Sequence, residues 1–344
     1  MQNTSVPASH IPMSDPISPV LVEVTRGRLI ESRHRGAAVV VDADGNVVAA
    51  WGNAALSIYP RSAIKPLQAL ALIETGAAKR FAVSAEEIAL ASASHDGDVE
   101  HVSRVAAWLG RMGMTEADLE CGAHAPTGAR AAEDLIRAGR APSALHNNCS
   151  GKHTAMLAGA LHRGEPVRGY IAADHPVQTR LKRLIAEMSG TDLAEAVSGV
   201  DGCGIPVYAM PLAGLARAMA ALARPDQLGS DRAEAARSVI AAMTRHPRLV
   251  SGPGRFDTEA MAAGAEMFVV KGGAEGVHAA AIPGRGLGVA LKIEDGAGRA
   301  SAVVMAALLE RFAGILLPAW TEIPLRNVAG REIGVLRAGP VLRA

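Results

Sequence analysis

The chain contains the run Tyr59-Pro60-Arg61-Ser62-Ala63-Ile64-Lys65-Pro66-Leu67-Gln68, in which a serine and a lysine stand three residues apart at the start of a predicted helix. That spacing puts both side chains on one face, about a turn from each other. Such a lysine can take the proton of the serine hydroxyl if burial or a second cation lowers the pKa of its amine. Because Pro66 fits only the first turn of a helix, the helix must start close to Ser62. The same pattern also suits a structural role, with Ser62 as the N-cap and Lys65 in solvent.

The composition favours a small polar substrate. The 344 residues carry a formal net charge of +1 and are 49% hydrophobic, enough to bury one large core or two unequal lobes. Balanced charge gives no electrostatic footprint for nucleic acid or an anionic membrane, and 3% aromatic residues are too few for base-stacking surfaces. No apolar run approaches the roughly 18 residues of a membrane span. We therefore expect a cytoplasmic protein with no nucleic-acid or membrane partner.

The order of elements predicts an α/β (α+β) protein with one antiparallel sheet flanked by helices. Alternating β-branched stretches predict strands at residues 20–25 and 37–51, the second folded back at the hairpin signal Asp44-Gly45. Helical patterns follow, one of them opened by the capping box Ser84-Ala85-Glu86-Glu87. Three more strands, at residues 266–271, 277–282 and 288–293, and a helix at 301–316 are predicted near the C-terminus.

This order also predicts how the chain is divided. We expect residues 1–18 to be a disordered extension. Residues 19–75 plus 263–344 would form a sheet lobe, and residues 76–262 an inserted helical lobe. The catalytic cleft is expected at the junction of the two lobes, where pockets tend to form.

A second lysine, Lys271, ends a predicted strand in the run Val269-Val270-Lys271-Gly272-Gly273. The glycines leave the strand backbone bare, so that a substrate can approach its N–H groups. Serine penicillin-recognising hydrolases likewise oppose an S-x-x-K helix start with a K-[ST]-G strand from the last third of the chain. Taken without Ser62, Lys271 would be an ordinary solvated residue at a strand end. The loop Ser92-Ala93-Ser94-His95-Asp96-Gly97 offers a second nucleophile or proton donor, or simply helix caps.

The most unusual run is His146-Asn147-Asn148-Cys149-Ser150-Gly151-Lys152-His153. Together with Asp201-Gly202-Cys203-Gly204 it offers two thiolates, imidazoles and a carboxylate, enough for a zinc site. Without a C-x-x-C pair the spacing does not specify a metal, and a polar substrate-binding loop is the alternative. Three widely spread cysteines, with Cys121 as the third, argue against a disulfide framework.

Taken together, these motifs resemble the rhizobial-type (class 3, thermolabile) L-asparaginases. The matching stretches come in family order over roughly residues 20–320. They are Glu31-Ser32-Arg33-His34, Pro60-Arg61-Ser62-Ala63-Ile64-Lys65, Ser94-His95, Glu120-Cys121-Gly122-Ala123-His124, the 146–153 run, Asp201-Gly202-Cys203-Gly204 and Lys271-Gly272-Gly273-Ala274-Glu275-Gly276. The resemblance implies a serine-β-lactamase/glutaminase-like fold, a homodimer, and hydrolysis of L-asparagine to L-aspartate and ammonia. The poorest match is the stretch 225–262.

The resemblance also implies roles for particular residues. Two catalytic pairs are implied, Ser62 with Lys65 and Ser94 with Lys271. The remaining implied roles are a zinc site at Cys149, Lys152 and Cys203, and substrate or metal-shell contacts from His153 and Asp201, to which we add Arg61 and Gly272 as substrate contacts. We expect zinc to shape the substrate pocket, because a Ser-Lys mechanism has no need of a Lewis acid.

Three other functions remain open. A penicillin-recognising hydrolase or another amidase could use the same scaffold, although no Tyr-x-Asn or Ser-Asp-Asn element is visible and we expect no signal peptide. A glutaminase differs by one methylene in its substrate, which pockets discriminate only modestly. A non-catalytic metal-binding protein would have no need of two Ser-Lys pairs.

Overall fold

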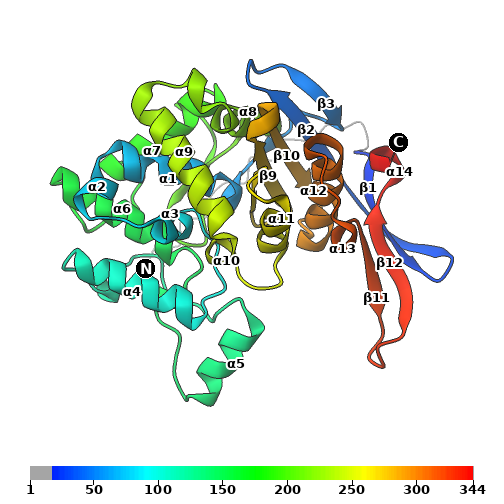
Figure 1. Cartoon of the computed structure of the whole chain (residues 1–344), viewed down its shortest axis with the longest axis horizontal. Coiled ribbons are helices and arrows are strands. Elements are labelled where there is room, and N and C mark those ends of the chain that lie inside the picture. The colour runs from blue at the N-terminus through cyan, green and yellow to red at the C-terminus, as the bar shows by residue number, and fades with distance from the viewer. Residues whose placement is uncertain (1–17, 344) are drawn as a thin grey trace, which may run out of the picture.

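The computed structural model describes residues 18–343, so the predicted extension lies outside the described residues except for Ser18. The main element is an antiparallel sheet of eight strands (Figure 1). Its strands are β1 (Val20–Arg26), β2 (Leu29–Asp42), β3 (Val47–Trp51), β8 (Val269–Gly272), β9 (Val277–Ile282), β10 (Leu287–Ile293), β11 (Glu322–Arg326) and β12 (Glu332–Ala338). They lie in the order β11-β12-β1-β2-β10-β9-β8, with β3 paired to β2. Both ends of the chain therefore build one sheet, as the sequence predicts.

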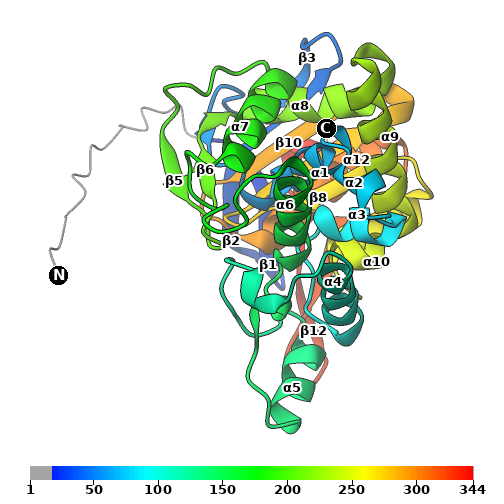
Figure 2. The same ribbon diagram turned by 90° about the vertical axis from the view of Figure 1, so that its left-hand side faces the viewer.

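Most helices come from the middle of the chain. They are α1 (Lys65–Glu74), α2 (Ala77–Arg80), α3 (Ala85–Ala91), α4 (Val99–Arg111), α5 (Ala129–Arg137), α6 (Ser150–Arg163), α7 (Pro176–Ser189), α8 (Leu212–Ala223), α9 (Ser230–Arg245), α10 (Pro247–Val250) and α11 (Phe256–Gly264). The later helices are α12 (Gly298–Ala313), α13 (Pro318–Thr321) and α14 (Pro340–Arg343). Two short strand pairs, β4 (Ser57–Ile58) with β7 (Met210–Pro211) and β5 (Ser198–Val200) with β6 (Pro206–Tyr208), lie outside the main sheet. Helix α6 packs among α1, α3, α4 and α7 (Figure 2). Its first eleven residues are buried.

Helices cover both faces of the main sheet. In β10, Gly288 and Leu291 are three positions apart and so point to opposite faces. A Cβ on Gly288 would lie 1.9 Å from a backbone oxygen of α8, so glycine lets this helix rest directly on the strand. On the other face Leu291 is paired with His278, whose ring lies 3.3 Å from Ser301 Oγ of α12. The sheet is therefore a central layer between α8 and α12.

Several local predictions are confirmed. The Asp44-Gly45 turn joins β2 to β3. The capping box opens α3, because Ser84 Oγ accepts the Glu87 N–H at 3.3 Å and the Glu87 carboxylate accepts the Ser84 N–H at 3.0 Å. The mixed α and β class and the antiparallel sheet flanked by helices are also those that the sequence predicts.

The start of α1 differs from the alternative considered above, in which Ser62 only caps the helix and Lys65 lies in solvent. A 3-10 turn, η1 (Arg61–Ile64), precedes α1, and Pro66 lies in the first turn of α1 as predicted. Ser62 lies inside η1, whose N-cap is Pro60, and Lys65 is buried. Neither an N-cap role for Ser62 nor a solvated Lys65 describes this segment.

The division into lobes at residues 76 and 262 stays a prediction. Helix α8 comes from the middle of that segment and packs on β2, β9 and β10 of the sheet. Within residues 18–343 no helix is long and apolar enough to cross a membrane.

Candidate active site

A cavity lies beside the start of α1, against α6, α7 and the loop that joins β5 to β6. Several residues singled out from the sequence line this cavity, namely Arg61, Ser62, Lys65, Lys152 and Asp201. The rest of its wall includes Gln68, Gln178, Leu181, Lys182, Val207 and Tyr208. The fold therefore brings η1, α1, α6 and the β5–β6 loop together around one space.

Lys65 is 1% exposed, and its amine is bonded to the Ser94 loop. Its Nζ donates to the Ala93 carbonyl at 2.5 Å and to Ser94 Oγ at 2.9 Å. Burial lowers the pKa of Lys65, although the neighbouring Cys149 sulfur opposes that shift. Within the part of the chain that the structure describes, the serine bonded to Lys65 is Ser94. Lys65, the predicted partner of Ser62, is thus bonded to the serine of the other predicted pair, and among residues 18–343 no hydrogen bond joins Ser62 to Lys65 or Ser94 to Lys271.

Ser62 shares the cavity with Lys65 because both belong to one tight turn. Side chains at positions i and i+3 of a 3-10 turn eclipse each other, which keeps these two on the same side. Gly273, the residue that follows β8, approaches this turn closely. A Cβ on Gly273 would lie 3.0 Å from the Ala63 nitrogen and 3.1 Å from the Pro60 oxygen, so a glycine there lets the strand touch η1. The edge of the main sheet thus lies directly against the serine turn.

Lys271 ends β8 and is 1% exposed, not a solvated edge residue. Its Nζ donates to the Gly272 carbonyl at 2.6 Å and lies 3.6 Å from Asp257 Oδ2. Burial lowers the pKa of Lys271 to about 8, with the Asp257 carboxylate opposing the shift. The Gly272 N–H donates to the same Asp257 oxygen at 2.8 Å, so it is already used within the protein. Lys271 and Gly272 therefore lie on the sheet side of the site, where they contact each other and Asp257.

Arg61 and Asp201 form an ion pair at the cavity wall. Arg61 Nε donates to Asp201 Oδ1 at 2.8 Å, and the side chains are 25% and 12% exposed. Burial raises the pKa of Asp201, but Lys152, a hydrogen bond from the Gly202 N–H and Arg61 together bring it below its usual value. Arg61 has a φ of 49°, which is uncommon for a residue other than glycine. The backbone is therefore held in an unfavourable conformation where this ion pair begins.

Cys149, Lys152 and Cys203 come together at the start of α6. All three are buried, and Lys152 Nζ lies 3.0 Å from Cys203 Sγ. A hydrogen bond from Cys203 lowers the pKa of the Cys149 thiol, whereas the same contact raises the pKa of Cys203. Burial acts to lower the pKa of Lys152, but the Cys149 and Cys203 sulfurs raise it. The cluster thus brings two cysteine sulfurs and the Lys152 amine close together in a buried position.

This donor set fits zinc. Two sulfurs and one nitrogen are ligands that zinc prefers, and each of them must be deprotonated to bind the metal. Among residues 18–343 no group of three His, Cys, Asp or Glu side chains could hold a metal. A metal at this cluster therefore depends on the Lys152 amine as a ligand.

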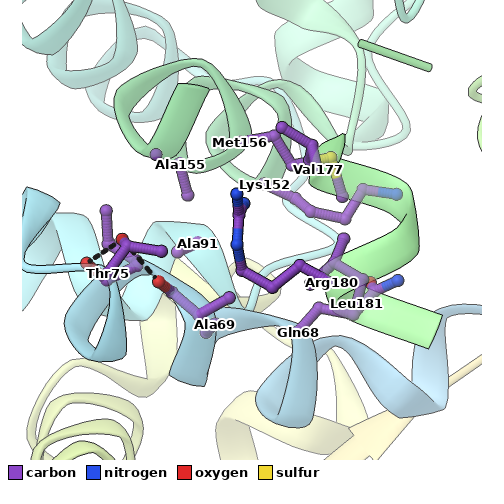
Figure 3. A pocket seen from close by; sticks show the side chains of 13 residues that line it. Gln68, Ala69, Thr75, Ala91, Lys152, Ala155, Met156, Val177, Arg180 and Leu181 are labelled. Atoms are coloured by element: carbon purple, nitrogen blue, oxygen red, sulfur yellow. Dashed lines mark hydrogen bonds between the residues drawn. The ribbon is translucent and has the colours of Figure 1, made fainter. Parts of the chain in front are cut away.

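His153 lies behind the cavity wall and not on it. It is 0% exposed, its Nδ1 is 2.8 Å from the Tyr170 hydroxyl, and its Nε2 has no hydrogen-bond partner among the described residues. A smaller second cavity shares Gln68, Lys152 and Leu181 with the first (Figure 3). Lys152, one of the predicted metal ligands, therefore lines both cavities.

Sequence reasoning missed two residues of this region, Asp257 and His278. Asp257 lies in the stretch that matches the resembling family least, and a single aspartate in a helix carries no signal of its own. His278 stands in an otherwise apolar strand, which is the one cue that could have marked it. The structure places both against Lys271 and Gly272.

Comparison with known proteins gives a family and, among solved structures, distant relatives. A β-lactamase from Mycobacterium bovis has a TM-score of 0.41 and 14% identity, covering 80% of this chain and 94% of its own. The protein Mglu has a TM-score of 0.46 and 15% identity, covering 88% of this chain and 70% of its own. Likenesses this distant assign no activity.

At the level of sequence, no curated protein matches the chain. The family model described as L-asparaginase II matches residues 22–338, nearly its whole length. The chain therefore belongs to the L-asparaginase II family and is a hydrolase of the asparaginase type, acting on linear amides.

Proposed function

We propose that the chain hydrolyses the side-chain amide of L-asparagine to L-aspartate and ammonia, with Ser62 as the nucleophile and Lys65 as its base. One observation carries this proposal: Ser62, the buried Lys65 and the Arg61–Asp201 ion pair line the same cavity. Hydrolysis of a small amino-acid amide needs a nucleophile with a base and a site for two opposite charges. Membership of the family supports the choice of amide.

Arg61 and Asp201 suit the charged ends of a free amino acid. The planar guanidinium of Arg61 matches the α-carboxylate of the substrate, and the Asp201 carboxylate accepts hydrogen bonds from the α-ammonium. The φ of 49° at Arg61 supports this role, because strained residues cluster at functional sites. His153 would orient the metal ligands from behind the wall, since it is buried away from the cavity.

The first half of the reaction transfers the acyl group to the enzyme. Ser62 Oγ attacks the amide carbon while neutral Lys65 takes the hydroxyl proton. Ser94, hydrogen-bonded to Lys65, passes a proton on to neutral Lys271, which gives it to the leaving nitrogen as the C–N bond breaks. The Ser62 N–H is our choice as an oxyanion donor. Ammonia leaves, and the aspartyl group stays on Ser62 as an ester.

The second half releases the product. Water attacks the ester carbon, and Lys65 takes one of its protons. That proton returns to Ser62 Oγ as the ester bond breaks, which frees L-aspartate and restores the starting protonation of the site.

Zinc would be held by Cys149, Lys152 and Cys203. When bound, it supplies a fixed positive charge that anchors one wall of the pocket. Lys152 lines the cavity, so its position helps to set the shape of the space that the substrate enters. The reaction described above uses only side chains of the protein.

Ammonia release from L-asparagine, L-glutamine and a chromogenic β-lactam, measured side by side, tests the proposal. We expect L-asparagine to have the highest kcat/KM. Preference for L-glutamine would make the chain a glutaminase, and preference for the β-lactam would contradict the proposed substrate class.

The proposal also includes a serine-β-lactamase/glutaminase-like scaffold, the rhizobial-type subclass, a homodimer and a cytoplasmic location. Light scattering after size exclusion checks the dimer.

A further inference from the structure

Lys271 is the proposed catalytic residue that lies farthest along the chain, and a buried carboxylate lies directly against it. Asp257, on α11, uses its Oδ2 to accept the Gly272 N–H at 2.8 Å, and the same oxygen is 3.6 Å from Lys271 Nζ. Asp257 is 6% exposed. One carboxylate oxygen therefore faces both the amine and the backbone of the strand end that carries it.

The other oxygen of this carboxylate is anchored to the sheet. His278 Nε2 donates to Asp257 Oδ1 at 2.7 Å, since an ionised carboxylate can only accept. His278 is held in turn by α12, with Nδ1 3.3 Å from Ser301 Oγ, and by the edge of the Phe256 ring, at 5.2 Å between centroids. Asp257 is thus held between β8 and β9.

Burying a carboxylate is costly unless its charge is matched. Burial acts to raise the pKa of Asp257, but His278 and Lys271 outweigh it and bring the pKa well below its usual value. Asp257 is therefore a permanent negative charge beside Lys271. The other charged or titratable groups that act on Lys271 are Lys65, Cys149 and Arg255.

We propose that Asp257, anchored by His278, is the positioning residue for Lys271: it fixes the amine behind the serine turn and stabilises the ammonium that forms when Lys271 takes a proton. The inference rests on the proposed relay role of Lys271. It gives a role to Asp257 and His278, for which the resemblance implies none. A purely structural carboxylate would hold α11 to β8 without affecting the proton chemistry of Lys271.

The direction of the expected pH effect follows from the charges. The relay starts from neutral Lys271, so kcat/KM of the wild type should include a rise near pH 8 that belongs to Lys271, separate from any rise that Lys65 adds. The Asp257 charge raises the pKa of Lys271, so its removal should move this rise to lower pH. An opposite charge at this distance shifts a pKa by about 1–3 units.

The experiment is the pH profile of kcat/KM for L-asparagine in the full-length wild type and in Asp257→Asn, Asp257→Glu and Lys271→Met. We expect Asp257→Asn to shift the rise to lower pH by about one unit or more and to lower the plateau by about tenfold or more. Asp257→Glu should recover most of the wild-type profile, and Lys271→Met should abolish the rise. The matched control is Glu23→Gln, which removes a buried carboxylate paired with Arg337 at 3.2 Å on β1, a strand separated from β8 by β2, β10 and β9. That variant should keep the wild-type profile.

Two outcomes would overturn the inference in distinguishable ways. If Lys271→Met abolishes the rise but Asp257→Asn leaves it in place, the positioning role alone is wrong. If Lys271→Met keeps the wild-type profile, the relay itself is wrong and the inference falls with it. Should Asp257→Asn fail to fold, His278→Leu, which has no hydrogen-bond donor in its side chain, replaces it. With its anchor gone, the Asp257 charge acts on Lys271 alone, and the rise should move to higher pH. An unmoved rise in that variant would count against the inference.

Discussion

Lys65, Lys152 and Lys271 are each at most 2% exposed, and a buried amine is tolerated only where its charge is removed or matched. Each amine has a different kind of side chain beside it. Lys65 contacts the hydroxyl of Ser94, Lys152 a cysteine sulfur and Lys271 a carboxylate. Three chemically different amines therefore surround one small site, which is why we give them three different roles.

Ser94 is proposed to pass a proton and not to bind substrate. Ser94→Ala should therefore lower kcat by about 10²–10⁴-fold with a small change in KM, the usual range for losing an acid–base group. Steady-state kinetics with L-asparagine provides the check. Ser92→Ala is the matched control, because Ser92 is buried two positions earlier and bonds the Ile88 carbonyl. A loss in the control as large as in Ser94→Ala would point to disruption of the loop.

Cys203 is proposed to act through the shape of the pocket. Cys203→Ser should raise KM by about tenfold or more and leave kcat within a few-fold, because the metal anchors the wall and takes no part in bond breaking. Kinetics and metal content measured on the same preparation test this. Cys121→Ser, at a buried cysteine outside the cluster, should change neither quantity. A collapse of kcat at unchanged KM in Cys203→Ser would contradict the pocket-shaping role.

Residues with a motif around them could be predicted from the sequence, and isolated ones could not. Ser62 and Lys65 were found from their spacing, and the structure brings both to one cavity. The contact between Lys65 and Ser94 could not be predicted from the sequence, because it depends on how α1 meets the loop after α3. Asp257 was missed for the same reason, since its partners lie on a strand that folds back against it.

At the scale of elements, the close contact between α8 and the sheet depends on Gly288. Gly288→Ala would place a methyl group 1.9 Å from a backbone oxygen of α8. We expect the free energy of unfolding to fall by about 1–3 kcal/mol or more, because backbone cannot move aside as a side chain can. Chemical denaturation measures this. Gly284→Ala, where nothing lies within 4 Å of the added methyl group, should cost far less. Equal losses in the two variants would contradict the argument.

Elements defined by local contacts were predicted well. The hairpin at Asp44-Gly45 and the capping box at Ser84 each need only residues close in sequence. The 3-10 turn before α1 was not predicted, because it packs against Gly273, which follows β8 and is distant in sequence. Local signals therefore describe where elements lie, and long-range contacts decide the geometry that matters at Ser62.

For the whole molecule, the site exists because distant segments meet. The turn at Ser62, helix α6 and the β5–β6 loop line one cavity, while β8 supports it from the edge of a sheet built from both chain ends. No single segment carries a complete site. The order of elements predicted the shared sheet. That α8 packs on this sheet could be seen only in the structure.

The central claim is that Ser62 is the nucleophile of an asparaginase. Its most direct test is the rate of ammonia release from L-asparagine by wild-type protein and by Ser62→Ala, with folding checked by circular dichroism. We predict that Ser62→Ala loses about 1000-fold or more in kcat, as expected when a nucleophile is removed. Turnover near the wild-type rate in a correctly folded Ser62→Ala protein would contradict the claim and make Ser94 the leading candidate.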